Sequence, residues 1–193
     1  MRTIPYGMFF LIMKKVDKNQ WFVIGLKVLE NDGFSKITID NLCTLLEITK
    51  GAFYHHFKNI DGYVDALMKY WLRQNTIQII EDADKLPSAK ERIGFIGNAV
   101  IQRLHKSEQV IRAWGFSSPI VKKYVQQVDD LRIEYSTKQR VLLGLSEEEA
   151  KNTSVLEYAI FVGGQQLFPD MDKKVLEQLY QFYCQKLQSN ELK

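Results

Sequence analysis

Apolar residues recur along the chain at steps of three and four positions, which is the spacing of one face of an α-helix. Two clear sets are Trp21, Phe22, Leu26 and Leu29, and then Ile93, Ile96, Val100, Ile101 and Leu104. No segment alternates apolar and polar residues over enough positions to predict a β-strand. The pattern therefore predicts an all-α fold in which the four prolines separate helices.

Residues that favour helix ends divide this pattern further. Gly33 can take the positive φ that closes a helix. Candidate N-caps precede the later helices at Thr38, Thr49, Asn59 or Asp61, Ser88, Ser118 and Ser146. We expect helices over residues 14–32, 39–46, 50–57, 60–84, 89–104, 109–114, 119–143, 147–168 and 172–187.

The charges are unevenly distributed along the 193 residues. Residues 1–60 contain eight Lys or Arg and five Asp or Glu, whereas residues 61–193 contain eighteen of each, so the net charge of +3 is entirely N-terminal. This asymmetry favours an N-terminal segment that meets an anion such as nucleic acid.

Composition excludes several other classes of protein. A chain that is 46% hydrophobic and 25% charged is typical of a soluble globular protein. The apolar run Met8–Met13 is shorter than the roughly 20 residues that cross a bilayer and shorter than a secretion signal. Cys43 and Cys184 form no disulfide framework, so we expect a cytoplasmic protein that does not enter a membrane, with Cys43 as a small buried residue.

Residues 37–57 carry the most informative motif, ITIDNLCTLLEITKGAFYHHF. Two short amphipathic helices are joined by about three residues near 46–48, which is the spacing of a helix-turn-helix. The second helix carries no bulky acidic residue, so it can approach DNA. Because Gly51 and Ala52 are small, the backbone of this helix can come close to the edges of the bases. Lys50 can donate a hydrogen bond to guanine. The same pattern also fits a helix pair that is only core scaffolding.

The neighbouring polar residues suit the DNA backbone. Tyr54 can contact a thymine methyl group or a phosphate, and His55, His56 and Lys58 suit phosphates. Adjacent His55 and His56 point about 100° apart on a helix and cannot share a metal ion. The pair His105 and Glu108 lacks further ligands, and no phosphate loop, GxSxG, HExxH or paired-carboxylate motif occurs. We therefore expect no catalytic site, metal or cofactor.

Two stretches, GFSKITIDNLC (33–43) and ITKGAFYHHFKN (48–59), resemble the DNA-binding domain of the tetracycline-repressor (TetR) family of transcriptional regulators. The most specific part of the resemblance is Thr49, Gly51, Tyr54, His56 and Phe57 at their observed spacing. It implies that Thr38 caps the first motif helix beside a phosphate, that residues 49–54 form the recognition helix, and that His56 and Lys58 follow the DNA backbone. Three positions differ from the usual family pattern. Glu47 stands where the family usually has a glycine in the turn, Cys43 where it has an alanine, and Ile60 where it has a phosphate-binding lysine.

The resemblance also implies the domain organisation. We expect an N-terminal arm over residues 1–13, a three-helix DNA-binding domain over 14–58, and a helical ligand-binding and dimerisation domain over 59–193. The expected partners are a palindromic double-stranded DNA operator, a small-molecule effector and a second copy of the chain. Repression released by the effector is the expected action; an interaction module that has lost DNA binding, or an enzyme of helical fold, are the alternatives.

The C-terminal region contains candidates for both remaining functions. Aromatic residues that could line a pocket for a hydrophobic or planar effector, or equally form a core, are Tyr70, Trp71, Phe95, Trp114, Tyr124 and Tyr158. Apolar stripes cover more of the last two helices than one core can bury. The predicted dimer interface contains Val155, Tyr158, Val162, Gly163, Val175, Leu179, Phe182 and Tyr183.

Overall fold

The computed structural model describes residues 16–102, 106–170, 172, 174, 175, 177–179, 181 and 182. All regular elements in these residues are helical, as predicted. They are α1 (Lys18–Asp32), the 3₁₀-helix η1 (Phe34–Lys36), α2 (Ile39–Leu46), α3 (Lys50–His56), α4 (Ile60–Leu72), the π-helical segment η2 (Arg73–Ile77), α5 (Gln78–Ala83), α6 (Ala89–Gln102), α7 (Lys106–Gly115), α8 (Pro119–Leu142) and α9 (Glu147–Leu167).

Most predicted helix ends are confirmed by their caps. Thr38 Oγ1 accepts from Asn41 N at 3.2 Å, and Asn59 Oδ1 accepts from Gly62 N at 2.8 Å. The predicted capping box of Ser146 is present before α9. The predicted start near residue 14 was wrong for α1, because an unanticipated capping box on Asp17 starts the helix at Lys18.

Two further helix predictions need correction. The helix expected over residues 60–84 is interrupted at residues 73–77 by the π-helical segment η2, and the helix expected over 109–114 begins earlier, at Lys106. The last predicted helix, 172–187, falls only partly within the described residues, of which 174, 175, 177–179, 181 and 182 are helical. The expected N-terminal arm, residues 1–13, lies outside the described residues.

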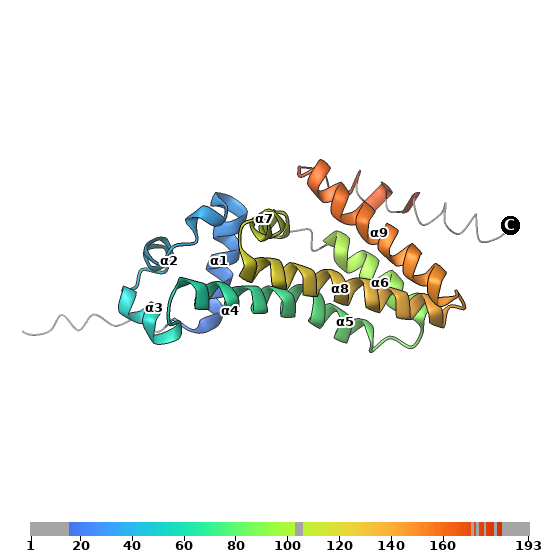
Figure 1. Ribbon diagram of the computed structural model, residues 1–193, viewed down its shortest axis with the longest axis horizontal. Coiled ribbons are helices and arrows are strands. Elements are labelled where there is room, and N and C mark those ends of the chain that lie inside the picture. The colour runs from blue at the N-terminus through green and yellow to red at the C-terminus, as the bar shows by residue number, and fades with distance from the viewer. Residues whose placement is uncertain are drawn as a thin grey trace, which may run out of the picture.

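The helices are arranged along one long axis (Figure 1). α1, α2 and α3 lie at one end, α4 and α8 run side by side through the middle, and α6 and α9 lie toward the other end. α7 packs against both α1 and α8. α9 packs against α8, so the predicted DNA-reading helices lie at the end of the molecule away from α9.

An aromatic core joins the N-terminal helices to α4. Trp21 of α1 meets Phe53 of α3 at 5.4 Å between ring centroids, and Phe57 meets Tyr63 of α4 at 5.1 Å. Tyr63 Oη also donates to Trp21 O at 2.9 Å. Gly25 permits this approach, because a Cβ atom there would lie 2.1 Å from Tyr63 Oη. α1 and α3 are thus anchored to α4 by buried rings.

Candidate nucleic-acid interface and internal cavity

The α2–α3 pair forms a compact helix-turn-helix. α2 buries Leu42 and Cys43 and α3 buries Phe53, so both helices hold their apolar sides against α1 and α4. The turn consists of residues 47–49, and its first residue, Glu47, has φ 57° and ψ 45°. Within the described residues, Glu47 is the sole non-glycine residue with positive φ. The sharp turn that the family pattern assigns to glycine is therefore made here by an acidic residue.

Most predicted DNA-binding residues share the exposed side of this unit. The exposed ones are Thr38, Thr49, Lys50, Gly51, Tyr54, His55 and Lys58, whereas Ala52 and His56 are half-buried. Thr49 stands at the N-cap of α3, but its side chain makes no capping hydrogen bond. Tyr54 is 56% exposed, with its ring edge against buried Phe53. The surface of α3 thus offers small and polar groups to an approaching duplex.

Lys50 is already engaged within the protein. Its Nζ lies 2.5 Å from Asp40 Oδ1, so the first residue of α3 is paired with the first turn of α2. The hydrogen bond from Lys50 to Asp40 raises the pKa of Lys50. Both side chains are well exposed, so solvent and salt screen the pair.

His56 has a contact that the sequence did not predict. Its Nε2 lies 3.0 Å from the carbonyl oxygen of Val16, just before α1, and therefore donates to it. His56 links the end of α3 to the start of α1 in this way. Nε2 is therefore not available for the phosphate contact that we predicted.

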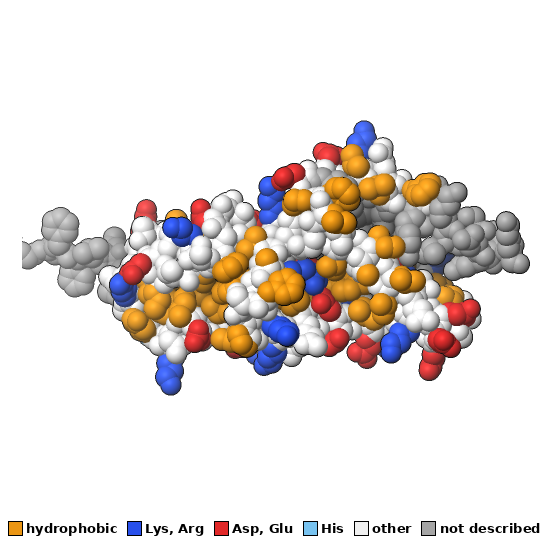
Figure 2. Space-filling view, turned by 45° about the horizontal axis from the view of Figure 1, so that its top comes forward, with side chains coloured by type: hydrophobic (Ala, Val, Ile, Leu, Met, Phe, Trp, Pro, Cys, Tyr) orange, Lys and Arg blue, Asp and Glu red, His pale blue; other side chains and the backbone are white. Residues whose placement is uncertain are grey.

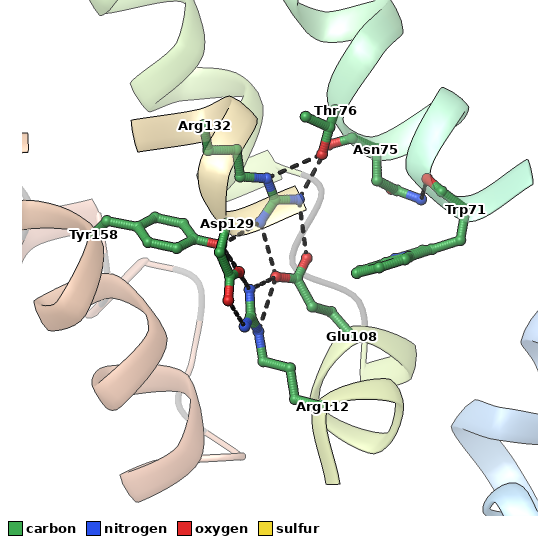
Figure 3. Close-up of polar contacts among 8 residues, drawn as sticks. All are labelled: Trp71, Asn75, Thr76, Glu108, Arg112, Asp129, Arg132 and Tyr158. Carbon is green, nitrogen blue, oxygen red and sulfur yellow. Dashed lines mark hydrogen bonds and ion pairs between the residues drawn. The ribbon is translucent and has the colours of Figure 1, made fainter. Parts of the chain in front are cut away.

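A buried network of charged residues connects α7, α8, α9 and η2 (Figure 3). Glu108 accepts from Arg132 at 2.8 and 3.2 Å and from Arg112 at 3.0 and 3.3 Å. Arg112 also donates to Asp129, and Tyr158 of α9 donates to Asp129 at 2.6 Å. The positive charges of Arg112 and Arg132 are therefore balanced by the negative charges of Glu108 and Asp129.

This network fixes the ionisation of its members. Burial alone would raise the pKa of Glu108, but Arg132 and Arg112 outweigh burial and hold that pKa below its ordinary value. Burial is the main cause that raises the pKa of Tyr158. Glu108 consequently stays ionised and Tyr158 stays neutral near neutral pH.

α7 connects this network to the N-terminal helices. Its residue Trp114 stacks on Phe34 of η1, with ring centroids 5.7 Å apart and planes 5° apart. A second link runs between α8 and α4, where Tyr124 Oη donates to Asp65 at 2.9 Å. Both links join the body of the protein to the helices that hold α2 and α3.

Arg132 and Tyr158 of this network also line a cavity of about 720 Å³. Its walls come from η2, α5, α6, α8 and α9, and from Leu179. Apolar side chains make up most of the lining: Ile79, Ile80, Ile93, Ile96, Leu156, Ile160, Phe161, Leu167, Phe168 and Leu179. The volume is within the range of small-molecule sites, which are about 300–1,000 Å³.

The comparisons with known proteins concern the structure. No protein-family model and no curated protein matches the sequence. A TetR transcriptional regulator from Legionella pneumophila is similar over 90% of this chain and 99% of its own, with a TM-score of 0.74 and 16% identity. The protein has the TetR-type fold. A protein from Pseudomonas aeruginosa PAO1 described as a transcriptional regulator is also similar, with a TM-score of 0.71 and 15% identity over 93% of this chain and 95% of its own.

Within the TetR-type fold, the cavity is not where most of the predicted ligand-binding aromatics lie. Trp71 and Tyr124 are buried in the hydrophobic core, and Tyr70 and Trp114 pack against that core. Phe95 is half-buried and does not line the cavity. Tyr158 alone of the six lines it. Large aromatic side chains at helical spacing can line a pocket or form a core. Helix packing places most of these six in or against the core, which is the second of the two roles that the sequence left open.

Sequence reasoning missed the polar side of the cavity. Arg132, Tyr135, Ser136, Gln139 and Arg140 line it from α8. Their spacing of three and four residues places them on one face of a long helix. This polar face was the signal available in the sequence, and in the structure it is turned toward the cavity.

The predicted dimer residues are divided between surface and cavity. Val155, Val175 and Phe182 are exposed, Tyr158, Val162 and Gly163 are half-buried, Leu179 is exposed and also lines the cavity, and Tyr183 lies outside the described residues. Hydrophobic side chains gather over α9 in the space-filling view (Figure 2). The dimer interface remains a prediction.

Two findings concern other classes of site. In the described part of the chain, no helix is long and apolar enough to cross a membrane. The described residues also contain no group of three or more His, Cys, Asp or Glu arranged to hold a metal ion. His105, one of the two residues weighed as a metal pair, lies outside them. Cys43 is buried as expected, and burial is the main cause that raises the pKa of its thiol.

Proposed function

We propose that the protein is a sequence-specific DNA-binding transcriptional regulator rather than an enzyme. The observation that carries this proposal is the helix-turn-helix of α2 and α3, which projects Lys50, Gly51 and Tyr54 from one end of the molecule. The TetR-type fold supports it, since both similar structures are of transcriptional regulators. In this role α3 enters the major groove, and the exposed groups around it contact phosphates.

The further proposal is that the protein acts as a dimeric repressor released by a small hydrophobic molecule in the cavity. Arg132 and Tyr158 line the cavity and also hold α7 through Glu108 and Arg112. α7 in turn packs on α1 and η1. A ligand that favours another position of α7 would move the helix-turn-helix and lower DNA affinity, typically by about 1–3 kcal/mol of coupling free energy.

DNA binding with substituted α3 residues tests the proposal. Lys50→Ala and Tyr54→Ala should each weaken binding to DNA from the protein's own promoter region by about 1–3 kcal/mol, measured by mobility shift and footprinting. Lys58→Ala should weaken binding to all sequences alike, because a phosphate contact carries no sequence information. Unchanged footprints with both Lys50 and Tyr54 truncated would show that α3 does not read DNA.

The second candidate function is a helical interaction module that has lost DNA binding. The pairing of Lys50 with Asp40 and the acidic residue at Glu47 favour it, because both place negative charge beside α3. The same mobility shift separates the two candidates, since the module would dimerise and leave promoter DNA unshifted.

A further inference from the structure

The cavity is open along α9. Side chains that line a closed cavity are buried, but Leu156 is 63% exposed, Ile160 58% and Leu167 74%, and all three line the cavity. Phe168 and Leu179, which continue the same lining, are also half or more exposed. The wall that α9 and the residues after it contribute therefore faces the solvent as well as the cavity.

An open apolar wall leaves a small-molecule site incomplete. Such sites typically bury about 70–90% of the surface of their ligand. The other walls meet this need, because Ile79 of α5 and Tyr135 of α8 are buried and the isoleucines of α6 are half-buried. A ligand in this cavity would still leave apolar surface in water along Leu156 and Ile160, unless a further surface covers it.

The exposed face of α9 is uncharged and mainly apolar over about four turns. Within residues 152–167, all of which the structure describes, the exposed positions are Asn152, Val155, Leu156, Ala159, Ile160, Gln166 and Leu167. Their spacing of three and four residues puts them on one side of the helix. The sole charged residue of this range, Glu157, is half-buried and paired with Arg140 of α8. Residues that line the cavity and residues that do not thus share one continuous surface.

The lack of charge on this face indicates which cover suits it. A strongly charged partner surface would lose its hydration against these residues and find no countercharge among them. The same face of a second copy of the chain is equally apolar and uncharged, so two copies related by a two-fold axis complement each other. At Gly163, in the same stretch, an added Cβ atom would meet nothing within 4 Å, so this side of α9 has room for another helix.

We propose that the ligand site is shared between two chains, because the exposed face of α9 from a second copy closes the cavity along Leu156, Ile160 and Leu167. A two-fold dimer then holds two such sites, and the ligand in each contacts both chains. The inference rests on the proposed function for the dimer and for the effect on DNA, and it adds that a single chain lacks a complete ligand site. A ligand that contacts both chains can set how they lie against each other, and thereby the separation of the two α3 helices.

Binding of the uncharged fluorescent probe N-phenylnaphthylamine to the full-length protein tests this proposal. Val155→Glu combined with Val175→Glu changes two exposed residues outside the lining and should prevent dimerisation, because the interface would bury their charges. This variant should be a monomer in sedimentation velocity and should bind the probe at least roughly tenfold more weakly, since tenfold corresponds to only about 60 Å² of apolar surface left in water. A folded monomer that binds the probe as tightly as the unmodified protein would overturn the proposal. An unmodified protein that binds the probe as a monomer, or does not bind it, would do the same.

A milder pair of substitutions keeps the test valid if the glutamates prevent folding. Val155→Ala combined with Val175→Ala should weaken the dimer without adding charge, so probe affinity should fall as the protein is diluted and its monomer fraction rises. Saturating probe should in turn shift dissociation of the dimer to lower protein concentration, because the coupling of two binding equilibria is reciprocal. Probe affinity that stays constant while the monomer fraction rises would overturn the proposal.

Three controls separate the shared site from other causes. Val141→Glu, exposed near the end of α8 and outside the lining, should leave both the dimer and probe binding unchanged. Ile96→Trp, in the α6 wall, should weaken probe binding and keep the dimer, because the larger side chain occupies part of the cavity. Unchanged probe binding in this variant would place the probe outside the cavity and count against the proposal. Truncation after Phe182 that abolishes probe binding in an intact dimer would show that residues 183–193 close the cavity instead of a second copy.

The outcome for DNA is separate. If the unmodified protein shifts its promoter DNA but monomer and dimer bind the probe equally, the shared site is wrong and the regulator function stands. If probe binding follows the dimer but no promoter DNA is shifted, the shared site stands and the proposed function is wrong.

Discussion

Glu47 has a left-handed backbone conformation, which is unfavourable for any residue other than glycine. The left-handed region costs an L-residue roughly 1–2 kcal/mol, because Cβ approaches the following carbonyl oxygen. The tight turn between α2 and α3 requires this conformation at residue 47, and the chain accepts it there without glycine. The helix-turn-helix is therefore formed at a cost in stability.

Glu47→Gly should stabilise the protein by about 0.5–1 kcal/mol. Glycine removes the cost of roughly 1–2 kcal/mol that the left-handed conformation imposes on Glu47. This gain exceeds the roughly 0.5–1 kcal/mol by which the greater conformational freedom of glycine stabilises the unfolded chain. Urea denaturation should show a higher midpoint with an unchanged slope. Glu47→Ala keeps the Cβ atom and removes the carboxylate, so it should not stabilise. Equal stabilisation by both substitutions would assign the effect to the charge instead.

In the proposed function, the pairing of Asp40 with Lys50 would compete with DNA. Asp40→Asn should increase affinity for promoter DNA several-fold at low salt, because it frees Lys50 and removes a negative charge beside α3. The gain should shrink as salt rises, and titrations by fluorescence anisotropy at two salt concentrations measure it. Glu148→Gln makes the same change of charge on exposed α9, far from α3. A similar gain in that control would show that only the net charge matters.

At the scale of elements, caps and spacing predicted the helices well, because these signals are local. Thr38, Asn59 and Ser146 cap the helices that they were expected to cap. The π-helical segment η2 was missed, because the sequence around it has neither proline nor glycine to mark a break.

The candidate cavity was harder to predict than the exposed face of α3. Exposed residues of α3 follow from one helix and its spacing. The cavity depends on how several helices pack, so Trp71 and Tyr124 fill the core and the isoleucines of α5 and α6 line the space.

The Glu108 network should make α7 sensitive to substitution and to acid. Glu108→Gln should destabilise the protein by about 3–5 kcal/mol, because it leaves Arg112 and Arg132 buried with one acid between them. The melting temperature should fall by about 10 °C. Exposed Glu134→Gln on α8 is the control and should change it little.

The pH dependence of this effect has a definite sign. The pKa of Glu108 is lower in the folded protein than its ordinary value, so its contribution is complete above the unfolded pKa of about 4.3 and is lost as pH falls through the folded value. Urea midpoints of the unmodified protein should therefore decline below about pH 4. Glu108→Gln should show a flatter decline over the same range, and parallel curves would exclude Glu108 as the titrating group.

At the scale of the whole molecule, α9 and described residues that follow it leave apolar surface open to solvent. Val155 is 41% exposed, Val175 45% and Phe182 57%, and none of them lines the cavity. Exposed apolar groups gathered on one side of a protein usually mark an interaction surface. A second copy of the chain fits this surface, because a two-fold axis would pack α9 and the helical residues after it against their equivalents in a four-helix interface.

Dimerisation would also set the DNA-binding geometry. A two-fold dimer that presents two α3 helices about 34 Å apart can enter successive major grooves of a palindromic site. Substitution of Val155 and Val175 together by Glu should give a monomer in sedimentation velocity at micromolar concentration, because two charges would have to be buried in the interface. Promoter binding should weaken strongly in that variant, since one α3 would contact one half-site. Val141→Glu, at an exposed position near the end of α8, is the control and should remain dimeric. A monomeric unmodified protein at the same concentration would contradict both the interface and the two-half-site mechanism.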